Sequence, residues 1–74
     1  MKTEKAIEIG ERLKELRGIR TRAGVAKAIG VSYNSLTNYE TGFRIPPDEV
    51  KIRLANYYGK TVQEIFFTDQ NYEK

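Results

Sequence analysis

The chain has 74 residues, a formal net charge of +3, and neither cysteine nor histidine. This length predicts one small domain, and the missing cysteines exclude disulfides and thiolate metal sites. No apolar run approaches the roughly 20 residues of a membrane span and no signal peptide is visible, so we expect a cytoplasmic domain. We expect no cofactor and no bound metal.

Positive charge is concentrated in the middle of the chain. Residues 12–53 carry nine Lys or Arg against four acids, whereas the segments on either side each have a net charge of −1. Between Arg20 and Arg44, Glu40 is the only acid. Such local charge favours a polyanionic partner through counterion release. A solvated, slightly basic surface is the alternative interpretation.

The first predicted helix covers residues 7–17. Its apolar residues recur at i, i+4 and i+7 and form one buried stripe: Ile9, Leu13 and Leu16. We expect residues 1–6 to be frayed and Arg12 to face water.

A short second helix is predicted at residues 22–29. Thr21 offers a side-chain oxygen as its N-cap, and Gly30 ends it, because glycine takes the left-handed backbone at a C′ position without strain. An apolar stripe lies between them at helical spacing: Val25, Ala26 and Ile29. Gly24 lies inside this helix and costs up to ~1 kcal/mol against alanine. It is either simply tolerated or marks the close approach of another backbone.

The third predicted helix covers residues 33–40, with Ser32 as its cap and only Leu36 and Tyr39 as apolar positions. Its uncharged polar residues are expected to face outward: Tyr33, Asn34, Ser35, Thr37 and Asn38. Exposed helix faces without a binding role normally carry Lys and Glu. This uncharged face therefore indicates a surface that recognises a ligand, and a plain polar surface is the alternative. Two helices joined by a glycine turn, the second of them capped, are typical of a helix-turn-helix motif.

Two further helices are predicted near the C-terminus. Pro46 and Pro47 bar helix continuation, so the next helix should cover residues 48–58. Thr61 and Glu64 then have the spacing of a capping box that starts a fifth helix. These elements predict an all-α fold of five short helices around one core.

That core should span about residues 7–67, followed by a polar tail at residues 68–74. Phe66 fits such a core, but Phe67 and Tyr72 are harder to place in a domain of this size. We expect them to form a dimer surface, with ordinary partial exposure as the alternative.

The ordered set of motif residues resembles the lambda repressor and Cro-like helix-turn-helix family, the Xre-type regulators. The matching residues are Ala26, Ile29, Gly30, Val31, Ser32, Leu36, Tyr39, Glu40 and Gly42. Residues 10–17, 54–59 and 62–66 look like the family's other helices, so the resemblance covers about residues 9–67. The likeness is greatest to small regulators of phages and mobile elements in Gram-positive bacteria. It implies a lambda repressor-like bundle that binds double-stranded DNA as a homodimer.

The resemblance also implies site residues by their position in the motif. The base readers would be Tyr33, Asn34, Ser35, Thr37 and Asn38. The phosphate ligands would be Thr21, Arg22, Ser32, Thr41 and Arg44. Arg17 and Glu40 match positions that form a partly buried ion pair, with exposure of both as the alternative. Arg22 stands where the family more often has glutamine, so a contact with Tyr33 is expected to be lost.

We therefore expect sequence-specific DNA binding and transcriptional regulation, by repression at a palindromic operator. The rival is a protein-interaction module of the same fold, such as an antitoxin or adaptor, and salt-dependent retention on DNA separates the two. An enzyme is least expected. Without His or Cys, catalysis would need clustered carboxylates or an activated lysine, and no glycine-rich phosphate loop is present.

Overall fold

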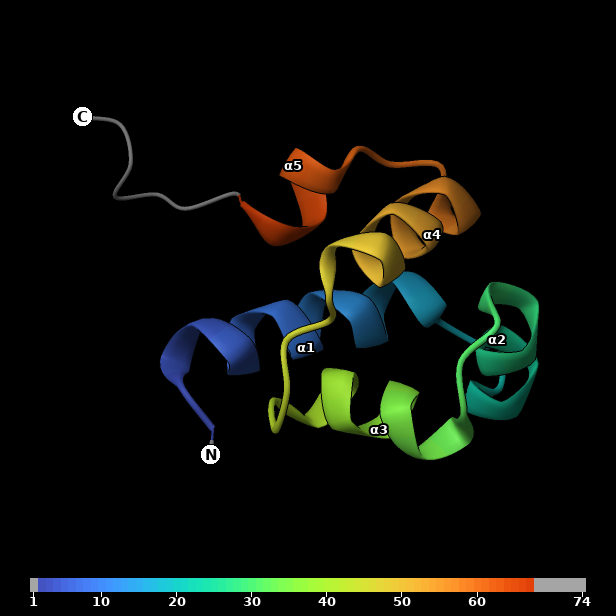
Figure 1. The fold of residues 1–74 in the computed structure, drawn as a ribbon, viewed down its shortest axis with the longest axis horizontal. Helices are drawn as coiled ribbons and strands as arrows, with labels where there is room; N and C mark the ends of the chain where they lie inside the picture. The colour runs from blue at the N-terminus through green and yellow to red at the C-terminus, as the bar shows by residue number, and fades with distance from the viewer. Residues whose placement is uncertain (1, 68–74) are drawn as a thin grey trace.

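The fold is an all-α bundle, as the sequence predicts. The computed structural model describes residues 2–67, so the expected polar tail and Tyr72 lie outside the described residues. Its helices are α1 (Glu4–Arg17), α2 (Arg22–Ile29), α3 (Tyr33–Thr41), α4 (Asp48–Tyr58) and α5 (Val62–Phe66). Figure 1 shows α1 running through the middle, with α3 on one side of it and α4 and α5 on the other. None of these helices is long and apolar enough to cross a membrane.

The core lies around α1, and every helix contributes to it. The most deeply buried large side chains are Leu13, Val25, Leu36, Leu54, Ile65 and Phe66. The apolar stripes predicted for the first three helices therefore face this core, and Leu16 packs against it while partly exposed.

The start of α1 differs from the prediction. The side chain of Thr3 accepts the backbone N–H of Ala6 at 3.0 Å, which caps the helix. Ala6 is also buried, so residues expected to fray are helical from Glu4 onward. The expectation that Arg12 faces water is also wrong, because its guanidinium donates to the backbone carbonyl of Ile65 and so joins α1 to α5.

Gly10 allows the backbone of α1 to lie directly against the end of α3. A Cβ atom at this position would lie 2.9 Å from the carbonyl oxygen of Tyr39 and nearer still to the carbonyl of Glu40. Gly24 is different, since a Cβ there would meet only the side-chain oxygen of Thr21, at 3.0 Å. Simple tolerance is therefore the correct interpretation of Gly24, and Gly10 is the glycine that a close backbone approach requires.

Candidate nucleic-acid interface

Gly30 and Val31 form the turn between α2 and α3. Gly30 has a φ of 77°, in the left-handed region that favours glycine. The Val31 amide donates to the carbonyl of Ala26 at 3.0 Å, which closes α2 in a Schellman-type arrangement. Ser32 then accepts the backbone N–H of Ser35 at 3.0 Å and starts α3. The glycine turn and the cap together fix the direction in which α3 leaves the turn.

The third helix turns two apolar side chains, Leu36 and Tyr39, into the core. All five predicted base readers are at least partly exposed: Tyr33, Asn34, Ser35, Thr37 and Asn38. Asn34 and Asn38 lie one turn apart on the same side of the helix. Tyr33, which is 53% exposed, stands at the start of the helix. This side of α3 therefore offers uncharged hydrogen-bonding groups to solvent.

Thr37 departs from the expectation that it faces outward. Its hydroxyl oxygen is buried and has no hydrogen-bond partner among residues 2–67. Thr37 lies three positions before the buried Glu40 and so shares that side of the helix. Thr41, expected to bind phosphate, instead donates its hydroxyl to the carbonyl of Thr37 at 2.8 Å. The hydroxyl of Thr37 is therefore turned inward, whereas Thr41 is partly exposed but uses its hydroxyl hydrogen within the helix.

Three charged side chains from three helices meet beside α3. Glu40 is only 1% exposed, and its Oε2 accepts the Nε–H of Arg17 at 2.9 Å. Its Oε1 accepts the Nε–H of Arg22 at 2.7 Å. The expected pair of Arg17 and Glu40 is present, and exposure of both partners is ruled out by the burial of Glu40. With two cations around one carboxylate, this Arg17–Glu40–Arg22 cluster keeps a positive charge at the start of α2.

The bond between Arg22 and Glu40 was not predicted from the sequence. It raises the pKa of Arg22 against the lowering effect of burial, and the nearby Tyr33 adds to the increase. Tyr33 therefore still lies beside Arg22, although only the bond to Glu40 has good hydrogen-bond geometry within the described chain. The sequence does contain a signal for this bond, because Glu40 is the only carboxylate between Arg20 and Arg44 and so the only acidic partner for Arg22 in that segment.

The remaining predicted phosphate ligands differ in availability. The oxygens of Thr21 and Ser32 both accept backbone N–H groups as helix caps, and the Ser32 hydroxyl also donates to Ser35 at 3.0 Å. Arg44 is exposed in the loop after α3. Its backbone N–H donates to the carbonyl of Asn38 at 3.2 Å, so this loop is fixed to the end of the helix that carries the polar face.

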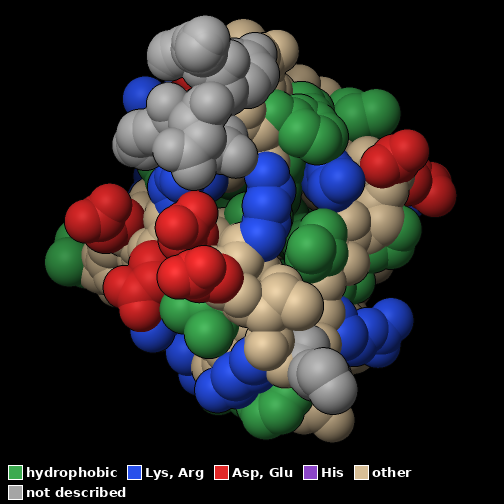
Figure 2. All heavy atoms as spheres, turned by 90° about the vertical axis from the view of Figure 1, so that its left-hand side faces the viewer, with side chains coloured by type: hydrophobic (Ala, Val, Ile, Leu, Met, Phe, Trp, Pro, Cys, Tyr) green, Lys and Arg blue, Asp and Glu red, His purple; other side chains and the backbone are tan. Residues whose placement is uncertain are grey.

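Acidic side chains occupy a different side of the domain. The exposed glutamates of α1 recur at three- or four-residue spacing and so share one side of that helix: Glu4, Glu8, Glu11 and Glu15. Figure 2 shows acidic side chains gathered together in one part of the face that it views. No group of acids in the described part of the chain is arranged to hold a metal ion. This side of α1 therefore repels polyanions.

A glycine turn between two capped helices, the second with a polar outer side, defines the class: a helix-turn-helix domain. The family described as "Helix-turn-helix domain" matches residues 8–65. Over 66 residues the chain is 29% identical to the HTH-type transcriptional regulator ImmR of Bacillus subtilis (strain 168), covering 86% of this chain and 52% of that protein. The chain therefore spans about half the length of this curated relative.

A solved structure has the same fold. The solution structure of the SOS-response transcriptional repressor LexA from Eubacterium rectale superposes with a TM-score of 0.84 at 22% identity, covering 100% of this chain and 80% of that one. The chain belongs to the Xre-like family of helix-turn-helix domains, which is a family of DNA-binding regulators.

Proposed function

We propose that the chain binds duplex DNA with sequence specificity and represses transcription. The observation that carries this proposal is the outer side of α3, where Tyr33, Asn34 and Asn38 present uncharged hydrogen-bonding groups. A helix held out in this way fits the major groove, where residues near its N-terminus meet base edges. The names of ImmR, a transcriptional regulator, and of LexA, a transcriptional repressor, support the regulatory part.

The base readers in this proposal are Tyr33, Asn34, Ser35 and Asn38 of α3. The amides of Asn34 and Asn38 can each accept from and donate to one adenine, a pairing worth roughly 1–3 kcal/mol of discrimination. Tyr33 can pack its ring on a thymine methyl group or donate its hydroxyl, and Ser35 has a shorter reach. Thr37 is left out because its hydroxyl is buried.

Phosphate contacts in this proposal lie on either side of the reading residues. Arg44 is exposed on the loop that is fixed to the end of α3. At the start of α2, Arg22 gives its Nε–H to Glu40 and keeps its terminal NH2 groups for a phosphate. The Thr21 hydroxyl hydrogen and the free N–H groups of that helix end add to the same site. Ser32 and Thr41 contribute less, because their hydroxyls donate within the chain.

We further propose that two copies bind a pseudo-palindromic operator as a homodimer. Helix-turn-helix dimers place their recognition helices about 34 Å apart, so that each enters the major groove of one half-site. Phe67 follows α5, is 46% exposed, and has the Lys51 ammonium 5.0 Å from its ring centre. This exposed ring is the best candidate for the contact between the two copies.

Selection of bound duplexes from a random DNA pool, read by sequencing, tests the proposal. Asn38→Ala should relax the preference at one base pair of each half-site and leave the salt dependence of binding unchanged, because no phosphate contact is lost. Arg44→Ala is the matched contrast. It should weaken all duplexes about equally and reduce the slope of affinity against salt by about one.

Two outcomes would overturn the proposal. If Asn34→Ala and Asn38→Ala both select the wild-type sequence, α3 does not read the bases. If the wild-type chain retains no duplex at low salt, the rival of a protein-interaction module with this fold becomes the better account.

A further inference from the structure

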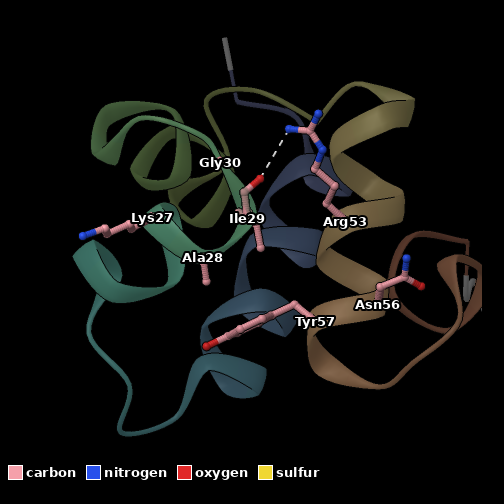
Figure 3. Close-up of a pocket in the computed structure, with 7 residues that line it drawn as sticks. All are labelled: Lys27, Ala28, Ile29, Gly30, Arg53, Asn56 and Tyr57. Atoms are coloured by element: carbon pink, nitrogen blue, oxygen red, sulfur yellow. Dashed lines mark hydrogen bonds between the residues drawn. The ribbon is translucent and has the colours of Figure 1, made fainter.

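An open groove lies between the C-terminal half of α2 and the outer side of α4, and the proposed function does not use it. Lys27, Ala28 and Tyr57 are among the residues that line it. Figure 3 shows the Tyr57 side chain extending from α4 toward Ala28, with Lys27 at the α2 edge. Arg53 crosses the other end and donates to the carbonyl of Ile29 at 3.3 Å. The groove thus has an aromatic floor between basic side chains.

Exposed apolar surface continues beyond the groove. Arg20 lies over the rings of Tyr57 and Tyr58, at 5.7 and 5.8 Å from their centres. The turn that carries Arg20 therefore borders the groove, and its neighbour Ile19 is 101% exposed. Tyr57 is itself 40% exposed, so the groove and the adjoining turn both offer apolar surface of the kind found at interaction sites.

Two of the cations around this patch, Arg20 and Lys27, form no ion pair within residues 2–67. Arg53 pairs with Glu49 at 2.9 Å, but Arg20 donates only to the backbone carbonyls of Leu16 and Arg17 among the described residues. Lys27 is exposed and has no carboxylate within ion-pair distance in residues 2–67. Two positive charges thus stand free at the rim of an apolar surface, which fits a partner surface that is both acidic and apolar.

The same domain carries a surface of that chemistry on the N-terminal half of α1. Glu4, Glu8 and Glu11 are exposed, and none of them forms an ion pair within the described chain. Ile7 lies three residues from Glu4 and four from Glu11, and it is exposed as well. Figure 2 shows hydrophobic side chains beside the gathered acids. A helix with an acidic and apolar outer side is suited to lie in a groove of opposite charge.

We propose that the α2–α4 groove binds the N-terminal half of α1 from a second copy of this chain. Ile7 of one copy would pack on Tyr57 and Ala28 of the next, with the α1 glutamates facing Lys27 and Arg20. The two surfaces differ, so the contact is head-to-tail and can be repeated from copy to copy. Figure 1 places the end of α5 and α2 at opposite ends of the domain, so a symmetric contact at Phe67 leaves the groove open.

Sedimentation velocity at low salt tests this contact in solution without DNA. All variants are made in a Phe67→Asp background, called the parent, which lacks the proposed symmetric contact. A failure of the head-to-tail contact is therefore distinguishable from a failure of the proposed function. Concentration-dependent association should persist in this parent. Lys27→Glu and Glu8→Lys should each weaken it about tenfold, the size of a lost charge contact at an interface rim. Lys60→Glu makes the same charge change outside the groove and should leave association unchanged.

The decisive measurement mixes the two weakened variants. Each variant sets like charges against each other when alone, whereas an equimolar mixture restores opposite charges at every contact and should recover the association of the parent. Recovery also shows that both variants are folded. The proposal fails if the parent stays monomeric at high concentration, if Lys27→Glu associates like the parent, or if the mixture recovers nothing.

Discussion

The contact between Gly10 and the end of α3 reverses the usual effect of replacing a helical glycine by alanine. In an exposed helix interior this change stabilises by roughly 0.5–1 kcal/mol. Here the added Cβ would lie 2.9 Å from the Tyr39 carbonyl oxygen and nearer still to the Glu40 carbonyl. Both obstacles are backbone, so α1 and α3 must move apart. Overpacking of this kind costs typically 1–3 kcal/mol, and we expect Gly10→Ala to destabilise the domain by about that amount.

Thermal unfolding followed by circular dichroism measures this effect. In a domain of this size, each kcal/mol lowers the melting temperature by about 4–8 °C. Gly24→Ala is the matched control, because its Cβ meets no backbone and only the Thr21 side-chain oxygen at 3.0 Å, so this variant should lose less stability than Gly10→Ala. A Gly10→Ala variant that is as stable as Gly24→Ala would refute the close approach of the two helices.

Three further predictions concern the charged cluster, the aromatic end of α4 and assembly. Glu40→Gln should lower the free energy of unfolding by about 3 kcal/mol, the low end for a broken buried pair, because the side chains of Arg17 and Arg22 are 18% and 26% exposed; an unchanged urea midpoint would contradict this. Burial raises the pKa of Tyr58 to about 12. The contribution of Tyr58 to the free energy of unfolding should therefore be fully present below about pH 10 and be lost as the pH rises toward 12. Tyr58→Phe should remove that alkaline loss and match the wild type at pH 7, because the hydroxyl is buried without a partner in residues 2–67; a loss above about 1 kcal/mol in urea unfolding would count against it. Phe67→Asp should shift the symmetric dimer toward monomer in sedimentation equilibrium at physiological salt, which screens the charges of the head-to-tail contact, without lowering the melting temperature. A wild-type chain that is monomeric on DNA would contradict this prediction.

Local chemistry made most of the fold predictable. Caps and glycine stops act over three or four residues, so the boundaries of α2 and α4 follow from the sequence alone. The Thr3 cap obeys the same rule, but the polar residues around it favour fraying, so the predicted first helix begins three residues later than α1 does. The four-residue spacing of Asn34 and Asn38 on a helix likewise predicts that both face away from the core.

The features that were missed depend on which helices meet. Nothing in the local pattern around Gly10 shows that another backbone lies against it. The bond between Arg22 and Glu40 joins residues 18 positions apart, and the buried hydroxyl of Thr37 depends on how α3 is turned against the core. Such contacts follow from tertiary packing, which no short window of sequence contains.

The division of α3 into a buried and an open side has a consequence for how this chain can evolve. Its attachment to the domain depends on Leu36, Tyr39 and Glu40, none of which reaches solvent. The side chains of Asn34 and Asn38 are not part of the buried core, so we expect their exchange for other side chains to cost little stability. In the proposed binding mode, the preferred DNA sequence can therefore change by point substitution, while selection for folding acts on a separate set of positions.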